Sequence, residues 1–338
     1  MEMVTFNPVD QRSLEGEEGK CGDIRINHLP TNEKKKKSKR RKLQRSVKGL
    51  WEKEEAKKKR YEETNKMWGD NPDSKGTHDI RITSTNINGF SCTGEVSEYI
   101  IASARFESDI NCFQEVNLNT RKGEVVQEIK KAIRDVETTN GSTFQTSCQL
   151  ETREEKRSRG KKKRGGTMIH VDRKWTGSSL KKYNDSIGRW SKITMEGRGQ
   201  RKLTIYSVYR VNDNTLENAG GETVWLQEYN SLLHRGSKDP NPRQQVLQDL
   251  KADILRTMTD ELHQIIVCID ANESTRRHKK SSIKQFMEDS GLVDCHQYSH
   301  PHLKETPTHA EGSSQIDYCF VSPNLLPHVQ RCGITALH

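Results

Sequence analysis

The chain has 338 residues, which is enough for one large domain with a tail or for two modest domains. Hydrophobic residues make up 30% of it and charged residues 31%, so part of the chain is expected to lie outside any core. The net charge of +10 favours a polyanionic partner, and no apolar run approaches the roughly 20 residues needed to cross a bilayer, so we expect no membrane partner.

The cysteine pattern and the N-terminal sequence predict an intracellular protein. The sequence MEMVTFNPVDQRSLEGEEGK lacks the basic segment followed by an apolar segment that marks a secretory signal. The 8 cysteines are scattered singly, without a C-x-x-C pair, which favours reduced thiols over a disulfide framework.

Residues 1–76 differ in composition from the rest and are expected to form a disordered or partly helical basic tail. The runs EKKKKSKRRKLQR and WEKEEAKKKRYEETNK contain too few apolar residues to be buried. Two interpretations of the stretch from Lys34 to Lys42 remain open. It is either a solvated linker, or a segment for nuclear import or for contact with phosphate groups.

From His78 onward, short apolar strands alternate with helical patterns. Predicted strands lie within residues 79–90, 108–116, 165–172, 201–211, 263–274 and 312–323. Predicted helices lie within 95–106, 123–136 and around 283–291, and the span 223–258 is mostly helical. Strands alternate with helices early and follow one another in the middle, which indicates an α/β domain whose sheets are covered by helices.

The end of one predicted strand raises a functional question. Residues 265–269, IIVCI, are apolar without alternation, which suits a strand covered on both faces. Asp270 and Asn272 follow, and they would emerge on the same face if the strand continues. They are either ordinary turn formers or a carboxylate and an amide that bind a metal ion, a phosphate or a water.

Polar residues end other predicted strands as well. Asn86 and Asn88 interrupt the first strand, Glu115 follows the second, and Asp317 lies in the last. Each of these residues alone is explained by a turn or by an exposed surface, so their arrangement along the chain must decide between the two interpretations.

Seven segments resemble, in order and spacing, the endonuclease/exonuclease/phosphatase superfamily: TSTNINGF, DINCFQEV, GGTMIHVD, IYSVYRVN, IIVCIDANES, GLVDCH and PTHAEGSSQIDYCFVSP. The resemblance extends from His78 to about His338. The N-x-N-G opening and the IDY-x-x-VSP closing are most similar to the endonuclease domain of non-long-terminal-repeat retrotransposons. The resemblance implies an α/β fold over residues 77–338, the four-layer α/β/β/α sandwich of deoxyribonuclease-like proteins.

The activity that the resemblance implies is magnesium-dependent hydrolysis of phosphodiesters, with Mn²⁺ as an alternative ion. The substrate would be DNA, nicked by an endonuclease of a retrotransposon-type element. Such hydrolysis needs a nucleophilic water and neutralisation of charge on the phosphoryl oxygens. Magnesium prefers oxygen ligands and keeps several of its waters, so few protein carboxylates are needed.

The resemblance also implies roles for individual residues. Glu115 would ligate the metal, and Asn88 occupies a position on the metal side. Asp270 would orient and deprotonate the attacking water. Asn272 and Asn86 would hydrogen-bond either the phosphate or Asp270.

Two further residues match positions that contact the substrate. Tyr209 corresponds to a tyrosine at the scissile phosphate, and Asn212 to an asparagine at a neighbouring phosphate. Val211 stands where the family usually has proline.

The family's last strand carries a Ser-Asp-His triplet, whose His is held by the aspartate that corresponds to Asp317. This chain instead ends in GITALH, 21 residues beyond Asp317. The favoured interpretation is a truncation before the triplet, with an inner strand of the sheet missing. In the alternative, His338 is a displaced substitute.

Rival functions remain. The chain could be a catalytically impaired remnant that binds nucleic acid, or a phosphatase or phosphodiesterase acting on inositol phosphates or lipids. The segment TREEKRSRGKKKRGG, residues 152–166, is expected to be an exposed loop or hairpin tip. It would either follow a nucleic-acid backbone or be a solvated loop.

Overall fold

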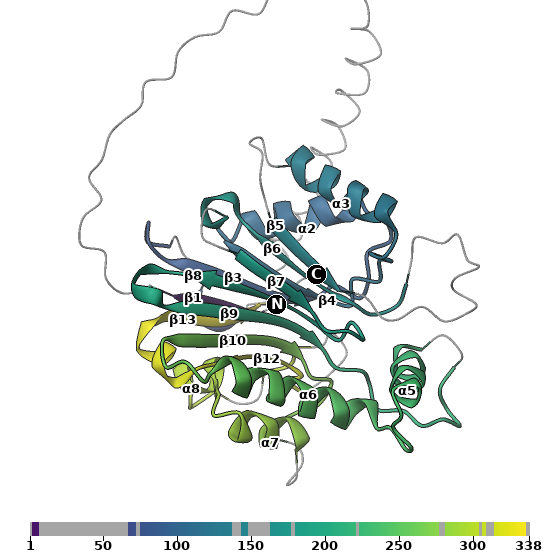
Figure 1. Ribbon diagram of the computed structural model, residues 1–338. Coiled ribbons are helices and arrows are strands. Elements are labelled where there is room, and N and C mark those ends of the chain that lie inside the picture. Colours follow the sequence, from purple (N-terminus) through teal and green to yellow (C-terminus); the bar gives the residue numbers. More distant parts are fainter. Residues whose placement is uncertain are drawn as a thin grey trace, which may run out of the picture. The chain divides into compact units, whose positions relative to one another are not determined.

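The computed structural model describes residues 2–6, 67–71, 75–136, 143–147, 163–176, 180–220, 223–276, 281–303, 306–308 and 314–335. They belong to one unit of the chain, made of Met1–Pro8 and Met67–Leu337. Strands and helices of this unit are shown in Figure 1.

The first sheet of the described residues has seven strands in the order β2-β13-β1-β3-β4-β6-β5. Their bounds are Glu2–Phe6 for β1, Met67–Gly69 for β2, Ile80–Asn86 for β3, Ile110–Gln114 for β4, Thr143–Ser147 for β5, Thr167–Val171 for β6 and Val329–Thr335 for β13. β3 and β4 run parallel, so their carboxyl ends lie at the same edge of the sheet.

The second sheet has six described strands in the order β11-β12-β10-β9-β8-β7. Their bounds are Leu180–Asn184 for β7, Trp190–Glu196 for β8, Lys202–Tyr209 for β9, His263–Asp270 for β10, Val293–Asp294 for β11 and Asp317–Val321 for β12. β9 and β10 are parallel, whereas β12 is antiparallel to β10. The end of β9, the end of β10 and the start of β12 therefore lie side by side.

Helices cover the outer faces of both sheets (Figure 1). The described α-helices are α2 Glu95–Ala104, α3 Gly123–Val136, α5 Val224–His234, α6 Pro242–Thr257, α7 Ser282–Asp289 and α8 Cys295–Ser299. α2 and α3 pack on the first sheet, and α6 and α7 pack on the second. The side chains of Asn241 and Ser281 cap α6 and α7 by accepting from backbone N–H groups. None of the helices in these ranges has the length and apolar character of a membrane span.

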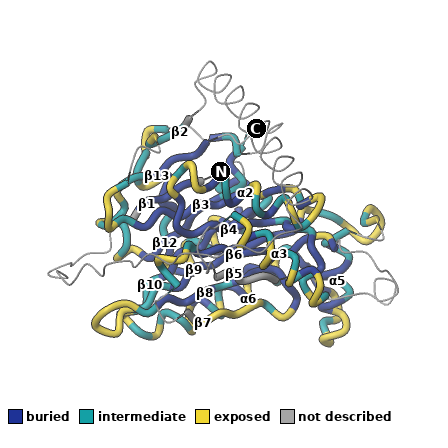
Figure 2. Tube along the Cα trace, turned by 90° about the horizontal axis from the view of Figure 1, so that it is seen from above, coloured by how far each residue is buried: buried dark blue, intermediate teal, exposed yellow. Residues whose placement is uncertain are grey.

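The packing of β10 explains why apolar and polar residues do not alternate in its sequence. Ile266 and Cys268 pack in the cluster between the two sheets, whereas Ile265 and Val267 pack against α6 and α7. Both faces of the strand are therefore covered, and the inner strands β3, β4, β6, β9 and β10 are mainly buried (Figure 2). The predicted four-layer α/β/β/α arrangement is confirmed.

The N-terminal boundary differs from the prediction, because residues 2–6 and 67–69 of the expected tail are strands of the first sheet. β1 pairs antiparallel with β3 on one side and with β13 on the other, and its Met3 and Val4 are buried. The charge runs dominate the composition of residues 1–76, so a five-residue strand leaves little trace in it. In the described residues β1 occupies an inner position of the sheet, between β13 and β3, while the absence of a further inner strand stays a prediction. The rest of the predicted tail lies outside the described residues, apart from the short stretches that flank β2 and precede β3.

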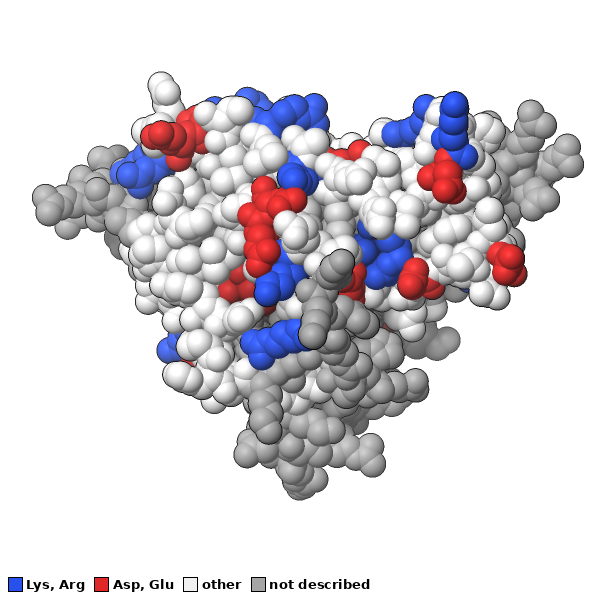
Figure 3. Space-filling view, turned by 90° about the horizontal axis from the view of Figure 1, so that it is seen from below, with Lys and Arg blue, Asp and Glu red and all other residues white. Residues whose placement is uncertain are grey.

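The outer face of α6 and α7 carries mixed charge. Acidic and basic side chains are interspersed over it in Figure 3. Lys251 of α6 pairs with Asp289 of α7 at 2.7 Å, and Arg256 pairs with Asp253 at 3.1 Å. These local pairs make this face a poor surface for a polyanion, which needs excess positive charge.

Candidate active site

Strands of both sheets bring polar residues to one edge of the sandwich. In the first sheet, β3 ends at Asn86, and Glu115 directly follows the parallel strand β4. In the second sheet, Asp270 lies opposite Tyr209 of β9 and opposite Asp317 of β12. The structure thus brings these five predicted residues to the same edge, while their chemical roles remain predictions.

The side-chain amide of Asn86 connects the two sheets. Its Nδ2 donates to Oδ2 of Asp270 at 2.6 Å and to Oε1 of Glu115 at 3.3 Å. Its Oδ1 accepts from the backbone N–H of Asn88 at 2.9 Å, which fixes the orientation of the amide. Of the two predicted partners of Asn86, Asp270 and phosphate, the structure shows the contact with Asp270.

Asp270 is a buried carboxylate with a perturbed pKa. Asp270 is 1% exposed. Burial, followed by the charges of Asp317 and Glu115, raises the pKa of Asp270 well above its usual range. The backbone N–H of Asn272 donates to Oδ1 at 3.0 Å and, like the amide of Asn86, opposes this rise. A carboxylate that is oriented by donors and has a raised pKa suits a general base.

Asn272 holds the turn that follows β10. Its φ is +48°, a left-handed conformation that asparagine adopts more readily than most residues. Its Nδ2 donates to the carbonyl of Arg210 at 2.6 Å and lies 3.5 Å from Oδ2 of Asp270. The amide is therefore bound mainly to the protein backbone and orients Asp270.

Tyr209 is buried beside Glu115. Burial, followed by the charges of Glu115 and Asp270, raises the pKa of Tyr209 far above its usual range. The phenol therefore stays protonated near neutral pH. The role that the resemblance implies, a contact with the scissile phosphate, stays a prediction.

Three predicted site residues are not part of this cluster of contacts. Asn88 and Asn212 are both exposed, and neither side chain hydrogen-bonds to the cluster within the described part of the chain. Asn88 contributes its backbone N–H to Asn86 instead. His338 lies outside the described residues, so its predicted role is not addressed.

The carboxylates at this edge fit a divalent cation. The charges of Glu115 and Asp317 both raise the pKa of Asp270, so negative charge is concentrated there, and oxygen ligands are those that magnesium prefers. Across the described ranges, no three acidic, histidine or cysteine side chains are arranged to hold a metal ion. Magnesium keeps several waters of its own, and Glu115 as its protein ligand stays a prediction.

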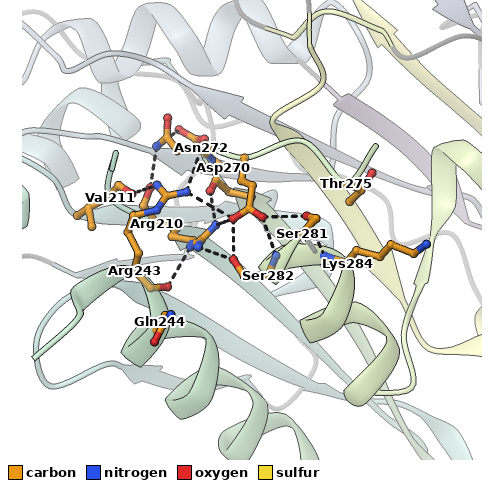
Figure 4. Close-up of polar contacts among 12 residues, drawn as sticks. Arg210, Val211, Arg243, Gln244, Asp270, Asn272, Thr275, Ser281, Ser282 and Lys284 are labelled. Carbon is orange, nitrogen blue, oxygen red and sulfur yellow. Dashed lines mark hydrogen bonds and ion pairs between the residues drawn. The ribbon is translucent and has the colours of Figure 1, made fainter. Parts of the chain in front are cut away.

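Sequence reasoning missed the charged residues behind the two turns (Figure 4). Arg210 directly follows Tyr209, Glu273 directly follows Asn272, and Arg210 Nη1 donates to Glu273 Oε2 at 2.6 Å. Arg243 at the start of α6 donates to the carbonyl of Asn272 at 3.2 Å. The sequence did contain one signal for these residues. Each of Arg210 and Glu273 directly follows a candidate site residue at the end of an apolar strand.

A group of buried, hydrogen-bonded polar side chains, also not predicted from the sequence, joins the two sheets beneath the site. Gln114 is fully buried, and its Nε2 donates to the hydroxyl oxygens of Ser84 at 3.2 Å and of Ser207 at 3.1 Å. Ser207 donates in turn to the carbonyl of Phe113 at 3.0 Å. Buried polar residues that are hydrogen-bonded across two layers restrict how one layer moves against the other.

No family model and no curated protein matches the chain. Among solved structures, the human Nocturnin catalytic domain with bound sulfate anion is similar at 14% identity and a TM-score of 0.46, over 76% of this chain and 85% of that one. An AP endonuclease from Archaeoglobus fulgidus is 14% identical with a TM-score of 0.43, over 76% and 99% of the two chains. The 3'-5' exonuclease NExo from Neisseria meningitidis is 16% identical with a TM-score of 0.44, over 75% and 97%. Similarity this distant carries no argument about activity or substrate.

Proposed function

We propose that this chain is a magnesium-dependent phosphodiesterase of the endonuclease/exonuclease/phosphatase superfamily. We further propose that it nicks DNA as the endonuclease domain of a retrotransposon-type element. The observation that carries the proposal is the bridge by which Asn86 joins Asp270 to Glu115. It brings together two carboxylates from different sheets, which we propose to be the general base, Asp270, and the metal ligand, Glu115.

In this proposal Asp270 accepts a proton from the attacking water. The water oxygen forms a bond to phosphorus while the bond from phosphorus to the leaving oxygen breaks. Asn86 and the N–H of Asn272 hold the two carboxylate oxygens of Asp270, so that its remaining lone pairs face the water.

Glu115 would hold Mg²⁺, and Mn²⁺ is the alternative ion. A bound ion would neutralise charge on the phosphoryl oxygens. Tyr209 would contact the scissile phosphate beside Glu115, whose charge acts on its phenol. Asn88 and Asn212 are exposed and so remain available to a metal-bound water and to a neighbouring phosphate, respectively.

The charge of the chain supports a nucleic acid as the substrate. Residues 152–166 contain eight Lys or Arg residues against two Glu residues. The described end of this segment is joined to the strand end at Glu115: Asn117 N donates to Gly165 O at 2.9 Å, and Lys163 N donates to Asn117 O at 3.0 Å. Basic residues here would contact phosphates beside the scissile bond. Lys34 to Lys42, outside the described residues, would serve nuclear import.

A comparison of substrates tests the proposal. The chain is incubated at one magnesium concentration with supercoiled plasmid and, separately, with a soluble inositol polyphosphate. We expect conversion of the plasmid to the nicked form and no release of phosphate from the inositol ester. Turnover of the inositol ester alone would overturn the nuclease assignment. Salt-sensitive binding of DNA without turnover of either substrate would favour the non-catalytic remnant.

A further inference from the structure

Arg210 occupies the junction between the two turns that carry Tyr209, Asp270 and Asn272. It is 2% exposed, although it is charged. Its guanidinium donates to Glu273 Oε2 at 2.6 Å, Ala271 O at 3.1 Å, Ser282 Oγ at 2.7 Å and Arg243 O at 3.0 Å. These acceptors come from the turn after β10 and from the first turns of α6 and α7. One side chain thus connects its own segment, after β9, with three others: the turn after β10 and the first turns of α6 and α7.

Arg243 joins the two turns directly. One terminal nitrogen of its guanidinium donates to the carbonyl of Val211 after β9, and the other to the carbonyl of Asn272 after β10 at 3.2 Å. The second nitrogen also lies 3.5 Å from Oε2 of Glu273. The planar fork of arginine suits two acceptors at a fixed separation, which a lysine ammonium does not reproduce.

Glu273 completes the network through its contacts with the two arginines and with Ser281 and Ser282. Its Oε1 accepts from the N–H of Ser282 at 2.6 Å and from the hydroxyl of Ser281 at 2.9 Å. Burial opposes the charged form, but hydrogen bonds from Ser282 and Arg210 and the charge of Arg210 outweigh it and lower the pKa of Glu273 to about 2. The carboxylate is therefore ionised near neutral pH and keeps both arginines anchored.

We propose that Arg210, Arg243 and Glu273 are positioning residues that hold Asn272, and through it the general base Asp270. The inference rests on the proposed function. Their contacts end on the carbonyl of Ala271, between Asp270 and Asn272, and on the carbonyl of Asn272 itself. Asn272 supplies the N–H that orients Oδ1 of Asp270. The left-handed φ of Asn272, at +48°, also requires surrounding contacts to maintain it.

The charges of this network are directed into the protein. Arg210 and Arg243 both donate to backbone carbonyls and to Glu273, and Arg210 also donates to the hydroxyl of Ser282. They are therefore not arranged to bind a substrate phosphate. Loss of the network would therefore affect the rate of the chemical step more than the binding of substrate. This separates a positioning role from a binding role.

The test compares Arg243→Met, Arg243→Lys and the control Lys251→Met in plasmid nicking. Lys251 pairs with Asp289 and so also joins α6 to α7. We expect Arg243→Met to lower kcat by about 100-fold, the loss typical of a catalytic group misplaced by about 1 Å, with KM within about twofold of wild type. Arg243→Lys should recover part of the rate because it keeps one donor, and Lys251→Met should retain wild-type kcat.

Hydrogen exchange at the backbone N–H of Asn272 gives a readout that is independent of turnover. We expect exchange in Arg243→Met to be at least about tenfold faster there, while amides in the middle of β10 stay protected. If wild-type protein cleaves no phosphodiester but the exchange result holds, the proposed function fails and the positioning role stands. The positioning role would be overturned if Arg243→Met kept the kcat and the exchange rate of wild type. It would also be overturned if Lys251→Met lost as much kcat as Arg243→Met.

Discussion

Asn86 and Asp270 are 184 residues apart in the sequence, and their side chains hydrogen-bond at 2.6 Å across the two sheets. The contact exists only when both sheets are packed together, because each residue ends a strand of a different sheet. The candidate site therefore depends on the packing of the whole sandwich, and no single motif contains it.

Replacing Asn86 with Ala should shift the pH dependence of hydrolysis. The amide stabilises the charged form of Asp270, so its loss should raise the pKa of Asp270 further. A general base acts when it is ionised, so the acidic limb of kcat/KM should move to higher pH. The limb is measured at saturating magnesium, with Asn324→Ala, beyond the far end of β12, as the control. An acidic limb that stays in place or moves to lower pH would contradict the assignment.

Replacing Glu115 with Gln should weaken magnesium binding, so that nicking requires more magnesium. The amide keeps the size of the side chain but removes the negative charge that would hold the ion. We expect the magnesium concentration for half-maximal nicking to rise by about 10-fold to 100-fold. Glu124→Gln, on the exposed first turn of α3, serves as the control. An unchanged magnesium response in Glu115→Gln would exclude Glu115 as the principal metal ligand.

Replacing Val4 with Asp tests whether β1 belongs to the first sheet. Val4 is 2% exposed and lies between β3 and β13, so a carboxylate there would be buried without a charged partner in the native packing. We expect a loss of about 2–3 kcal/mol in the free energy of unfolding, read from urea denaturation. Gln330→Asp, at an exposed position of β13, should change stability little. Equal stability of Val4→Asp and wild type would show that β1 is not a strand of this sheet.

Neutralising part of the basic segment should weaken DNA binding in a salt-dependent way. With Lys156, Arg157, Lys161 and Lys162 changed to Gln, the slope of log affinity against log salt should become shallower by about 0.9 for each DNA phosphate that the protein no longer neutralises. Binding is measured without magnesium to prevent cleavage. The double variant Lys251→Gln with Arg256→Gln, whose charges are paired on α6 and α7, is the control. An identical slope in all three proteins would show that the segment does not bind the DNA backbone.

The strand ends could be predicted because their residues are local signals. The apolar run before Asp270 indicated a strand covered on both faces, and the structure confirms it. The ordered motifs led to the four-layer fold and to the group of Asn86, Glu115 and Asp270. β1 could not be predicted, because a five-residue strand pairs with partners some 80 and 330 residues away along the chain. The burial that makes such a strand stable is not visible in its own sequence.

The network behind the turns could not be predicted for a related reason. Arg210 reaches Glu273 and Ser282 across 63 and 72 positions, and the charge of each residue alone would indicate an exposed surface. These residues are buried only because β9, β10, α6 and α7 pack around them in the folded protein. Arg210 and Glu273 lie within two of the matched segments, but the resemblance implied no role for either of them, whereas it did for Asp270 and Asn272.

The most direct test of the account is the rate of plasmid nicking by wild-type protein and by Asp270→Asn at the same magnesium concentration. Asparagine keeps the shape of the side chain but cannot take the proton of the attacking water. The account predicts magnesium-dependent nicking by wild type and a loss on the order of 10²–10⁴ in the variant, with the Kd for DNA within about twofold. Nicking by Asp270→Asn at the wild-type rate would contradict Asp270 as the general base and, with it, the proposed active site.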